Sequence, residues 1–264
     1  MPGITTTLPV EKFKDGRVIT ATDEVVREVP VTIFLNDEEL VTLVCSPDQL
    51  EELAVGFLCA ENILHRREDL KGITVNREDG LIWVETAGPS PQRQTFMKRY
   101  LTTCCGRGRS SFYFVNDARS IPPVNSKLQI EAVRLLDLER QLEASAATFG
   151  ATGGTHGAAL CSSAGILLFY EDIGRHNAVD KIFGRCFLDG LALNDKILAF
   201  SGRISSEILI KVARMGIPVL VSRGAPTDLA LAMAAETGIT VAGFARGDRM
   251  NVYTGAQRII FGGQ

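Results

Sequence analysis

Short apolar runs alternate with helix-like stretches through the second half of the chain, and this alternation limits the folds open to it. The predicted strands are 165–170, 196–200, 219–222 and 239–244, and the predicted helices lie near 176–188, 204–215 and 227–237. Strands and helices that alternate at this spacing predict a mostly parallel sheet covered by helices.

The first half of the chain predicts a smaller α+β unit. Apolar runs flank short polar turns twice, and the predicted hairpins pair 29–35 with 40–45 and 73–76 with 81–86. A helix is predicted between them, because Ser46 resembles an N-cap with Pro47 in the first helical position. Apolar residues then recur at helical spacing, namely Leu50, Leu53, Ala54, Phe57 and Leu58.

Together these patterns predict an α/β chain, α+β overall, in three parts. Residues 1–24 are polar and lack periodicity, so we expect a loose N-terminal arm. Residues 25–125 form the smaller α+β domain. Residues 126–264 form the larger α/β domain, which we expect to begin with a helix from Ser126 to about Ala147.

Composition excludes several classes of protein. The net charge of −3 over 264 residues lacks the basic surplus typical of nucleic-acid binders. No stretch approaches the roughly 18–20 uncharged apolar residues that a membrane helix needs, and the N-terminus has no apolar signal region. Six irregularly placed cysteines do not make a disulfide framework. We therefore expect a cytoplasmic protein with reduced thiols and neither nucleic-acid nor membrane partners.

Each predicted strand of the second half is followed by a small, glycine-containing, cationic segment. The residues concerned are Arg175 and His176 after the first strand, Arg203 after the second, Arg223 after the third, Arg246 and Arg249 after the fourth, and His156, which follows two glycines near an expected helix start. Ligands of open α/β sheets bind beyond the carboxyl ends of the strands. Arginine forks and free backbone N–H groups match phosphate oxygens, so these segments predict a large, multiply anionic ligand.

Any one of these arginines, taken alone, is equally consistent with a solvated loop charge. The chain has neither the GxxxxGK[ST] pattern of P-loop nucleotide hydrolases nor a GxGxxG segment after a strand. The ligand therefore remains unidentified from these residues alone.

Two adjacent cysteines, Cys104 and Cys105, differ from the other four. The others, Cys45, Cys59, Cys161 and Cys186, are predicted to be buried small hydrophobic residues. The adjacent pair instead stands among Gly106, Arg107, Gly108 and Arg109. Nearby cations lower the pKa of a thiol and favour the reactive thiolate. A metal site is disfavoured, because the cysteines lack CxxC-type spacing and an adjacent pair cannot easily direct both sulfurs at one ion.

Six ordered motifs make the chain resemble the FdhD/NarQ family of formate dehydrogenase accessory sulfurtransferases over roughly residues 27–262. The motifs are TTCCGRGR (102–109), TGGTHGAA (152–159), EDIGRHNAVDK (171–181), SGRISSE (201–207), SRGAPT (222–227) and FARGDRMNVYT (244–254). The resemblance implies that residues 126–264 adopt a three-layer, cytidine-deaminase-like α/β fold. It also implies a homodimer.

The resemblance further implies a sulfur carrier. Sulfur would pass from a cysteine desulfurase to a persulfide on Cys105, and then to the molybdenum cofactor, bis(molybdopterin guanine dinucleotide), before this enters formate dehydrogenase. GDP would act as an analogue of the bound substrate, and no structural metal is implied. The family's cofactor-binding segment corresponds to Phe244, Ala245, Arg246, Gly247, Asp248 and Arg249. Two guanine nucleotides bring two diphosphates, which would account for the four cationic segments.

One departure from the family pattern concerns the cysteines. Many members have a second cysteine where this chain has Gly108, and this chain has the additional Cys104 before the carrier position. A mechanism that needs a CxxC disulfide is therefore excluded. We expect a single persulfide on Cys105, with Cys104 as a possible assistant.

Two other functions remain as alternatives. A chaperone that binds the molybdenum cofactor without transferring sulfur would not require Cys105. A deaminase-like hydrolase would need the H-x-E and P-C-x-x-C motifs of the zinc deaminases. His156 is instead followed by Gly157-Ala158, and SGRISSE stands where the cysteine pair would be sought.

Overall fold

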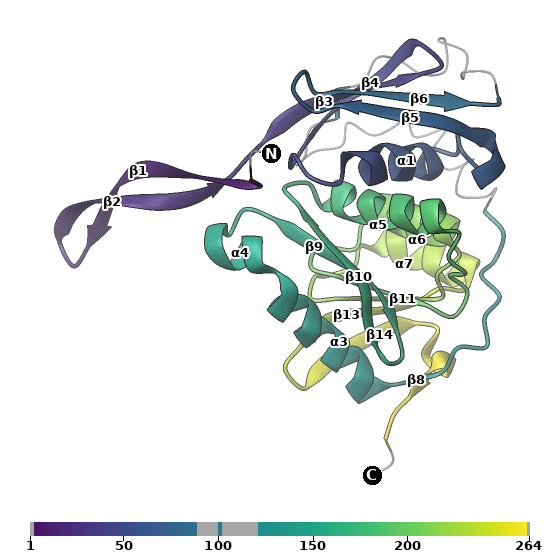
Figure 1. The fold of residues 1–264 in the computed structure, drawn as a ribbon. Helices are drawn as coiled ribbons and strands as arrows, with labels where there is room; N and C mark the ends of the chain where they lie inside the picture. The colour runs from purple at the N-terminus through teal and green to yellow at the C-terminus, as the bar shows by residue number, and fades with distance from the viewer. Residues whose placement is uncertain (1–2, 89–99, 102–120, 263–264) are drawn as a thin grey trace.

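A computed structural model of the chain describes residues 3–88, 100–101 and 121–262. Figure 1 shows the layers in the order sheet, helices, sheet, helices, with a hairpin projecting to one side. The mixed α/β class predicted from the sequence is confirmed.

The first layer is a five-stranded sheet in the order β5-β6-β3-β4-β7. Both predicted hairpins are confirmed, because β3 pairs antiparallel with β4, and β5 with β6. Strand β7 joins the far edge, where it runs parallel to β4. The bounds are β3 Val29–Leu35, β4 Glu38–Cys45, β5 Leu70–Asn76, β6 Leu81–Thr86 and β7 Tyr100–Leu101, with a 3₁₀ turn at Arg67–Asp69.

Helix α1, Leu50–Ala60, covers this sheet, and its start corrects one prediction. The five residues predicted to form its apolar face are all buried. The helix begins four residues after Ser46, however, and Gln49 precedes it in a left-handed conformation without a side-chain cap. Ser46 does not cap the helix because its hydroxyl group is engaged in a buried polar network described below.

The second sheet has six strands in the order β10-β9-β11-β12-β13-β14. All four predicted strands are present, as β10 to β13. The bounds are β9 His156–Ser162, β10 Gly165–Asp172, β11 Ile197–Phe200, β12 Val219–Ser222, β13 Thr240–Arg246 and β14 Arg249–Thr254.

The direction of the strands corrects the predicted mostly parallel sheet. β11, β12 and β13 are parallel neighbours, but β9 runs antiparallel to both β10 and β11, and β14 runs antiparallel to β13. His156 therefore begins strand β9 and not a helix. The small, buried residues after it pair on both sides within the sheet, and this pairing outweighs the local turn-like sequence. The predicted strands β10 to β13 nevertheless all point the same way.

Helices cover both faces of the six-stranded sheet (Figure 1). The predicted helices appear as α5, α6 and α7 on the face toward α1. The bounds are α5 Arg175–Asp189, α6 Ser206–Met215 and α7 Asp228–Thr237, with α3 Ala132–Ser145 and α4 Ala147–Thr152 on the other face.

The helix predicted from Ser126 begins later than expected. The Ser126 hydroxyl donates to the carbonyl of Asn194 and accepts from the amide of Leu128, which makes a local turn and not a cap. The next residues form strand β8, Ile130–Glu131, which pairs with β15, Ile259–Ile260, after a 3₁₀ turn at Ala256–Arg258. Helix α3 can start only after this strand.

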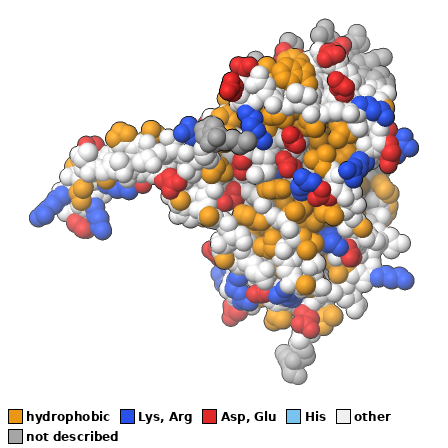
Figure 2. All heavy atoms as spheres, viewed as in Figure 1, with side chains coloured by type: hydrophobic (Ala, Val, Ile, Leu, Met, Phe, Trp, Pro, Cys, Tyr) orange, Lys and Arg blue, Asp and Glu red, His pale blue; other side chains and the backbone are white. Residues whose placement is uncertain are grey.

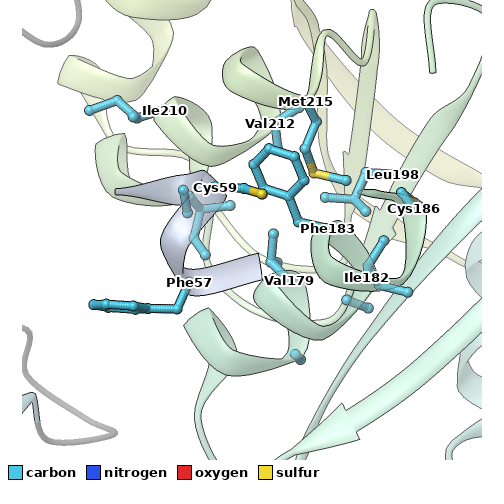
Figure 3. Packing of buried hydrophobic residues seen from close by; sticks show 14 of the residues in the cluster. Phe57, Cys59, Val179, Ile182, Phe183, Cys186, Leu198, Ile210, Val212 and Met215 are labelled. Carbon is cyan, nitrogen blue, oxygen red and sulfur yellow. The ribbon is translucent and has the colours of Figure 1, made fainter. Parts of the chain in front are cut away.

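One apolar core continues from the five-stranded sheet through α1 to α5, α6 and α7. Figure 3 shows Cys59, Phe183 and Met215, from α1, α5 and α6, directed toward one another. A second cluster fills the space between the six-stranded sheet and α3. Cys45, Cys59, Cys161 and Cys186 are buried free thiols, as predicted. The proposed division between residues 25–125 and 126–264 stays a prediction.

The N-terminal segment is not the loose arm that its polar sequence predicts. Strands β1 (Thr5–Lys14) and β2 (Arg17–Val26) form a regular antiparallel hairpin. Its turn residues Asp15 and Gly16 both have positive φ, at 52° and 77°, as a tight type I′ turn requires. Backbone pairing between the two strands and the residues of the tight turn thus order a segment whose apolar residues do not recur at regular spacing.

Helices α1 and α5 pack with their backbones in close approach at two glycines. A Cβ atom at Gly56 would lie 1.8 Å from the carbonyl oxygen of Asp180, and one at Gly184 would lie 1.9 Å from that of Glu52. Backbone atoms cannot rotate away from such contacts. The packing of the N-terminal layer on the larger domain therefore depends on glycine at both positions.

We expect Gly184→Ala to lower the free energy of unfolding at the upper end of the roughly 1–3 kcal/mol typical of overpacked cores, because α1 must move away from α5. Denaturant unfolding of the full chain measures this. Gly150→Ala is the matched control, since Gly150 lies in helix α4 and a Cβ atom there would have no neighbour within 4 Å, so it should be neutral or slightly stabilising. Equal losses for the two variants would contradict the packing account.

Candidate functional site

The cationic segments predicted from the sequence meet at one edge of the six-stranded sheet. Strands β10 to β13 end there, and the antiparallel strands β9 and β14 begin there. The residues brought to this edge are His156, Arg175, His176, Arg203, Arg223, Arg246 and Arg249. We call it the strand-end site. The functions of these residues stay predictions.

Glycines let the loops of the strand-end site touch one another. A Cβ atom at Gly224 would lie 2.5 Å from the carbonyl oxygen of Gly202, and one at Gly202 would lie 3.5 Å from Cβ of Arg175. The loops after β10, β11 and β12 are therefore in contact. Larger residues at either glycine would separate the loops that carry the neighbouring cations Arg203 and Arg223.

The last loop of the site is attached to its neighbour through the predicted cofactor-binding segment. The amide of Phe244 donates to the carbonyl of Gly224, at 3.1 Å. The guanidinium of Arg246 donates through Nε and a terminal nitrogen to the carbonyl of Arg223, at 3.3 and 3.2 Å. Phe244 has a φ of 54°, a conformation that is uncommon outside glycine. A residue held in this way at a strand end is typical of functional sites.

The cations of the site differ in how they are engaged. Arg223 forms an ion pair with Glu143 of α3. The Nε atom of Arg175 is buried without a hydrogen bond. Arg203 and Arg249 have no ion pair or side-chain hydrogen bond within residues 3–88, 100–101 and 121–262. Arg203 and Arg249 are thus the two arginines of the site most available to an incoming anion.

The two histidines of the site are held neutral. Burial lowers the pKa of His176 to about 3, with further lowering from Lys211 and Arg175. Burial also lowers the pKa of His156, assisted by Arg175. Nε2 of His176 lies 3.3 Å from a carboxylate oxygen of Glu207, but not in hydrogen-bond geometry. Positive charge at this edge therefore comes from arginine, while the imidazoles offer neutral hydrogen-bonding groups.

A buried glutamate beside the site was not singled out by the sequence. Glu139 of α3 is 3% exposed, accepts a 3.3 Å hydrogen bond from the amide of Phe200 at the end of β11, and leaves Oε2 without a partner. Burial raises the pKa of this carboxyl group to about 8, against smaller opposing effects of the Phe200 amide and Arg223. The sequence gave no signal for this residue, because a glutamate in an amphipathic helix is expected at the surface, whereas Glu139 is buried.

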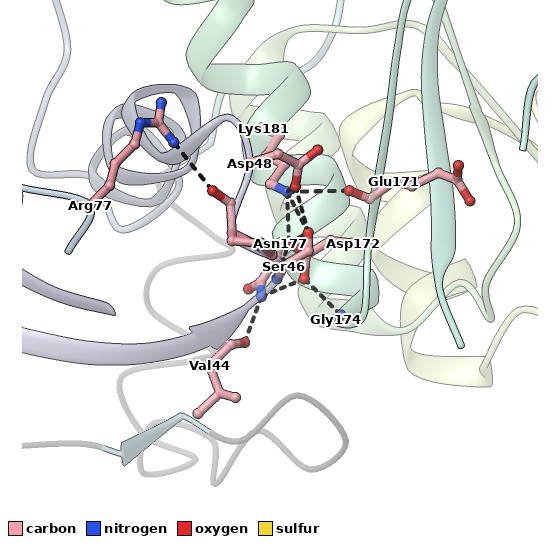
Figure 4. A network of polar contacts seen from close by, with 10 residues as sticks. Val44, Ser46, Asp48, Arg77, Glu171, Asp172, Gly174, Asn177 and Lys181 are labelled. Carbon is pink, nitrogen blue, oxygen red and sulfur yellow. Dashed lines mark hydrogen bonds and ion pairs between the residues drawn. The ribbon is translucent and has the colours of Figure 1, made fainter. Parts of the chain in front are cut away.

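Beside the strand-end site, the buried carboxylate of Asp172 joins the two sheets. Figure 4 shows Ser46, from the chain after β4, directed at Asp172 at the end of β10. Asp172 Oδ2 accepts from the amide and hydroxyl of Ser46, at 3.2 and 2.8 Å, and pairs with Nζ of Lys181 at 2.8 Å. Its Oδ1 accepts from the Gly174 amide at 2.8 Å and from Asn177 at 2.9 Å. These groups form the Asp172 junction.

Lys181 supplies the counter-charge of the junction from helix α5. Its side chain is fully buried and also donates to Ser46 Oγ, Asp48 and the carbonyl of Glu171. Burial lowers the pKa of Lys181, but Asp172 and Asp48 outweigh burial and raise it above its ordinary value. The lysine is therefore charged, and every proton of its ammonium group has an acceptor.

The junction lies next to the chain that leads into the cysteine motif. Asn177 donates to the carbonyl of Val44 in β4, at 2.9 Å. Strand β7 pairs with β4 so that Leu101 lies beside Leu43. Cys104 and Cys105 follow at once in the sequence but lie outside the described residues. The motif EDIGRHNAVDK thus supplies Arg175 and His176 to the site. It also supplies four residues of the junction that the sequence did not identify, namely Asp172, Gly174, Asn177 and Lys181.

The described residues contain no group of three or more His, Cys, Asp or Glu side chains placed for a metal ion. No helix among them is long and apolar enough to cross a membrane. The expected absence of a structural metal stays a prediction.

We expect Asp172→Asn to lower the free energy of unfolding by about 3–5 kcal/mol, because Lys181 would keep a buried charge with a weakened partner. Chemical denaturation measures the loss. The control is Asp189→Asn at the other end of α5, where Asp189 pairs with Arg185 at the surface, and its effect should be much smaller. Equal losses of unfolding free energy in the two variants would contradict a large stabilising contribution from the Asp172 junction.

The chain is similar to known proteins over almost its whole length. The model of the FdhD/NarQ family matches residues 26–260. A protein of Geobacillus kaustophilus named "Sulfur carrier protein FdhD" is 44% identical over 255 residues, which cover 96% of this chain and 97% of that protein. Proteins of the same name from Listeria innocua and Bacillus subtilis are 46% and 40% identical, covering 95% and 97% of this chain and 97% and 98% of their own lengths.

A solved structure has the same fold. The crystal structure of a putative formate dehydrogenase accessory protein from Desulfotalea psychrophila superimposes with a TM-score of 0.81 at 26% identity, and the match covers 98% of this chain and all of that one. The match of the family model over most of the sequence and the near-complete coverage of relatives at least 40% identical lead to one conclusion. This chain belongs to the FdhD/NarQ family.

Proposed function

We propose that the protein is a sulfur carrier that serves a formate dehydrogenase. Sulfur passes from a cysteine desulfurase to Cys105 as a persulfide, and from there to the molybdenum cofactor in its bis(molybdopterin guanine dinucleotide) form. On this proposal the protein is a cytoplasmic sulfurtransferase, and the molybdenum cofactor is its substrate. Relatives named as sulfur carriers support the transfer, and the solved accessory protein supports the link to formate dehydrogenase.

The observation that carries the proposal is the convergence of arginines at the strand-end site. Four parallel strands end there in contacting loops, and neutral histidines lie among the arginines. A dianionic diphosphate suits such an edge, because arginine donates two parallel hydrogen bonds to phosphate oxygens. A substrate with two diphosphates would make use of several loops at once.

The Asp172 junction supports a connection between the two halves of the proposed reaction. It holds the start of α5, which carries Arg175 and His176, against the end of β4. The strand paired with β4 leads directly into the motif that contains Cys105. Substrate binding and sulfur transfer are thus assigned to neighbouring parts of the chain.

The first chemical step is an exchange of sulfane sulfur. The Cys105 thiolate attacks the outer sulfur of the desulfurase persulfide, the S–S bond of the donor breaks, and the donor cysteine leaves as a thiolate. Electrons balance without an external oxidant. Arg107 and Arg109, beside Cys105 in the sequence, favour the thiolate that this step needs.

We expect the peptide that contains Cys105 to gain one sulfur atom when the protein is incubated with a cysteine desulfurase and cysteine. Trypsin cleaves after Arg99 and Arg107, so one peptide contains both adjacent cysteines, and mass spectrometry reads its mass. Cys104→Ser is the matched variant and should keep the added sulfur, whereas Cys105→Ala should lose it.

The reverse pattern would assign the persulfide to Cys104. If neither variant nor the parent chain gains sulfur, the carrier proposal fails. A cofactor chaperone without sulfur transfer would then be favoured, provided that Cys105→Ala still supports formate dehydrogenase activity in cells.

We expect GDP to bind the strand-end site and Arg249→Gln to weaken it roughly tenfold or more, which corresponds to the loss of one charge-assisted hydrogen bond. Isothermal titration calorimetry measures the affinity. Arg249 suits the test because it has no ion pair or side-chain hydrogen bond among the described residues, so its removal should not disturb the loops. Arg66→Gln, on the surface of the N-terminal layer, is the control. Unchanged affinity in Arg249→Gln would remove Arg249 from the binding site.

A further inference from the structure

Helix α3 contacts three loops of the strand-end site from the face of the sheet opposite α5, α6 and α7. Glu139 accepts a hydrogen bond from the amide of Phe200 at the end of β11, and Glu143 pairs with Arg223 after β12. Arg140 donates to a backbone carbonyl in the turn between β13 and β14, at 3.4 Å. One stretch of α3 therefore joins the loops that carry the arginines of the site.

The two glutamates of α3 differ in their contact with water. The side chain of Glu143 is 62% exposed, whereas Glu139 is 3% exposed and lies beside the apolar cluster between α3 and the sheet. Figure 2 shows acidic and basic side chains mixed over the lower part of the molecule, where Figure 1 places α3. Water and such neighbours compensate the charge of an exposed carboxylate. Glu139 is cut off from both.

Only one oxygen of Glu139 has a partner among the described residues. Oε1 takes the Phe200 amide, and Oε2 is buried without a hydrogen bond. An ionised carboxyl group in this position is costly. Burial raises the pKa of Glu139 to about 8, the Phe200 amide and Arg223 act to lower it, and Glu143 acts to raise it. Cys161 of β9, the other titratable neighbour, keeps its proton because burial raises its pKa to about 12.

Arg223 therefore serves two anions at once. It is the cation that favours the ionised form of Glu139, and it is also one of the arginines assigned to the ligand of the strand-end site. A phosphate bound to Arg223 would cancel the effect of the guanidinium charge on Glu139. The exposed Glu143 can turn to solvent when a phosphate displaces it. The buried Glu139 has no such outlet, and a nearby anion favours its neutral form.

We propose that Glu139 is a positioning residue of the strand-end site, and that its carboxyl group takes up a proton from solvent when a diphosphate engages Arg223. This assignment rests on the proposed function, because it takes a nucleotide diphosphate as the ligand of this edge. The proton removes the repulsion between Glu139 and the ligand. Oε1 remains the acceptor of the Phe200 amide and keeps the end of β11 in place.

The direction of the pH dependence follows from this exchange. The protonated form of Glu139 favours the ligand, so affinity is highest below the pKa of about 8 and falls as pH rises through it. A rise of one unit in this pKa on binding corresponds to an overall tenfold change in affinity. The histidines of the site do not titrate in this range, because burial lowers the pKa values of His156 and His176.

Isothermal titration calorimetry of GDP at about pH 8.5, in two buffers with different heats of ionisation, measures the proton uptake. We expect the parent chain to take up roughly half a proton for each GDP, and its affinity to fall up to about tenfold between about pH 7 and about pH 9.5. Glu139→Gln keeps an acceptor for the Phe200 amide and cannot ionise, so it should take up no proton and its affinity should stay constant over this range.

The matched control is Glu236→Gln, at an exposed glutamate on α7, which should behave as the parent chain does. Uptake that is absent from the parent chain, or that persists unchanged in Glu139→Gln, would overturn the proposal.

Unfolding of the ligand-free chain tests Glu139 without a nucleotide. A glutamate of an unfolded chain has a pKa of about 4.3, below the value of about 8 in the fold. The parent chain should therefore lose stability relative to Glu139→Gln as pH rises between these values. In chains that also carry Arg223→Gln, which removes the guanidinium charge as a bound phosphate would, this loss should extend to higher pH.

The outcomes separate this proposal from the proposed function. A stability difference that does not change with pH, or that Arg223→Gln leaves unaltered, would overturn the link between Arg223 and Glu139 even if GDP binds. If GDP does not bind but both pH effects are present, the proposed function fails while that link stands.

Discussion

The carboxylate of Asp172 is the interaction on which the arrangement of this protein depends. It is fully buried and accepts hydrogen bonds from Ser46, Gly174 and Asn177 while it pairs with Lys181. Such a charge is tolerated in a core only when each oxygen is satisfied. The groups that satisfy it come from the chain after β4 and from the first half of α5 with the residue before it, so the N-terminal layer and the start of α5 have one defined placement.

The directions of the strands give the strand-end site its set of charged residues. Because β10 to β13 point the same way, segments far apart in the sequence deliver arginines to one edge. Glycines at the loops permit the close contacts, and burial keeps the histidines neutral. The fixed charge therefore suits phosphate oxygens, while uncharged imidazoles remain for hydrogen bonding. Asp172 joins this sheet edge to Ser46 after β4, and β4 pairs with β7, the strand that precedes the cysteine motif in the sequence.

Much of this fold follows from local patterns in the sequence. Strands β10 to β13 and helices α5 to α7 were predicted because their apolar runs have clear periods and glycine boundaries. Strand β9 was not predicted, because its small residues carry no local strand signal. Pairing with β10 on one side and β11 on the other makes this segment a strand. Ser46 resembled a helix cap, since a sequence does not show a partner 126 residues away. The segment that forms the hairpin β1–β2 resembled a coil in the sequence, because backbone pairing between its two strands, and not burial of apolar side chains, orders it.

The cationic loops of the site were predicted, but the buried acidic residues beside it were not. Glu139 and Asp172 resemble ordinary surface acids in the sequence, and only tertiary packing buries them. We propose that this sheet edge binds the nucleotide part of the proposed substrate. A crystal structure of the full chain with GDP tests it most directly. We expect the diphosphate to lie at the carboxyl ends of β10 to β13, and a diphosphate in the cavity between the C-terminal ends of α1, α5 and α6, lined by Cys59, Phe183 and Arg214, would contradict it.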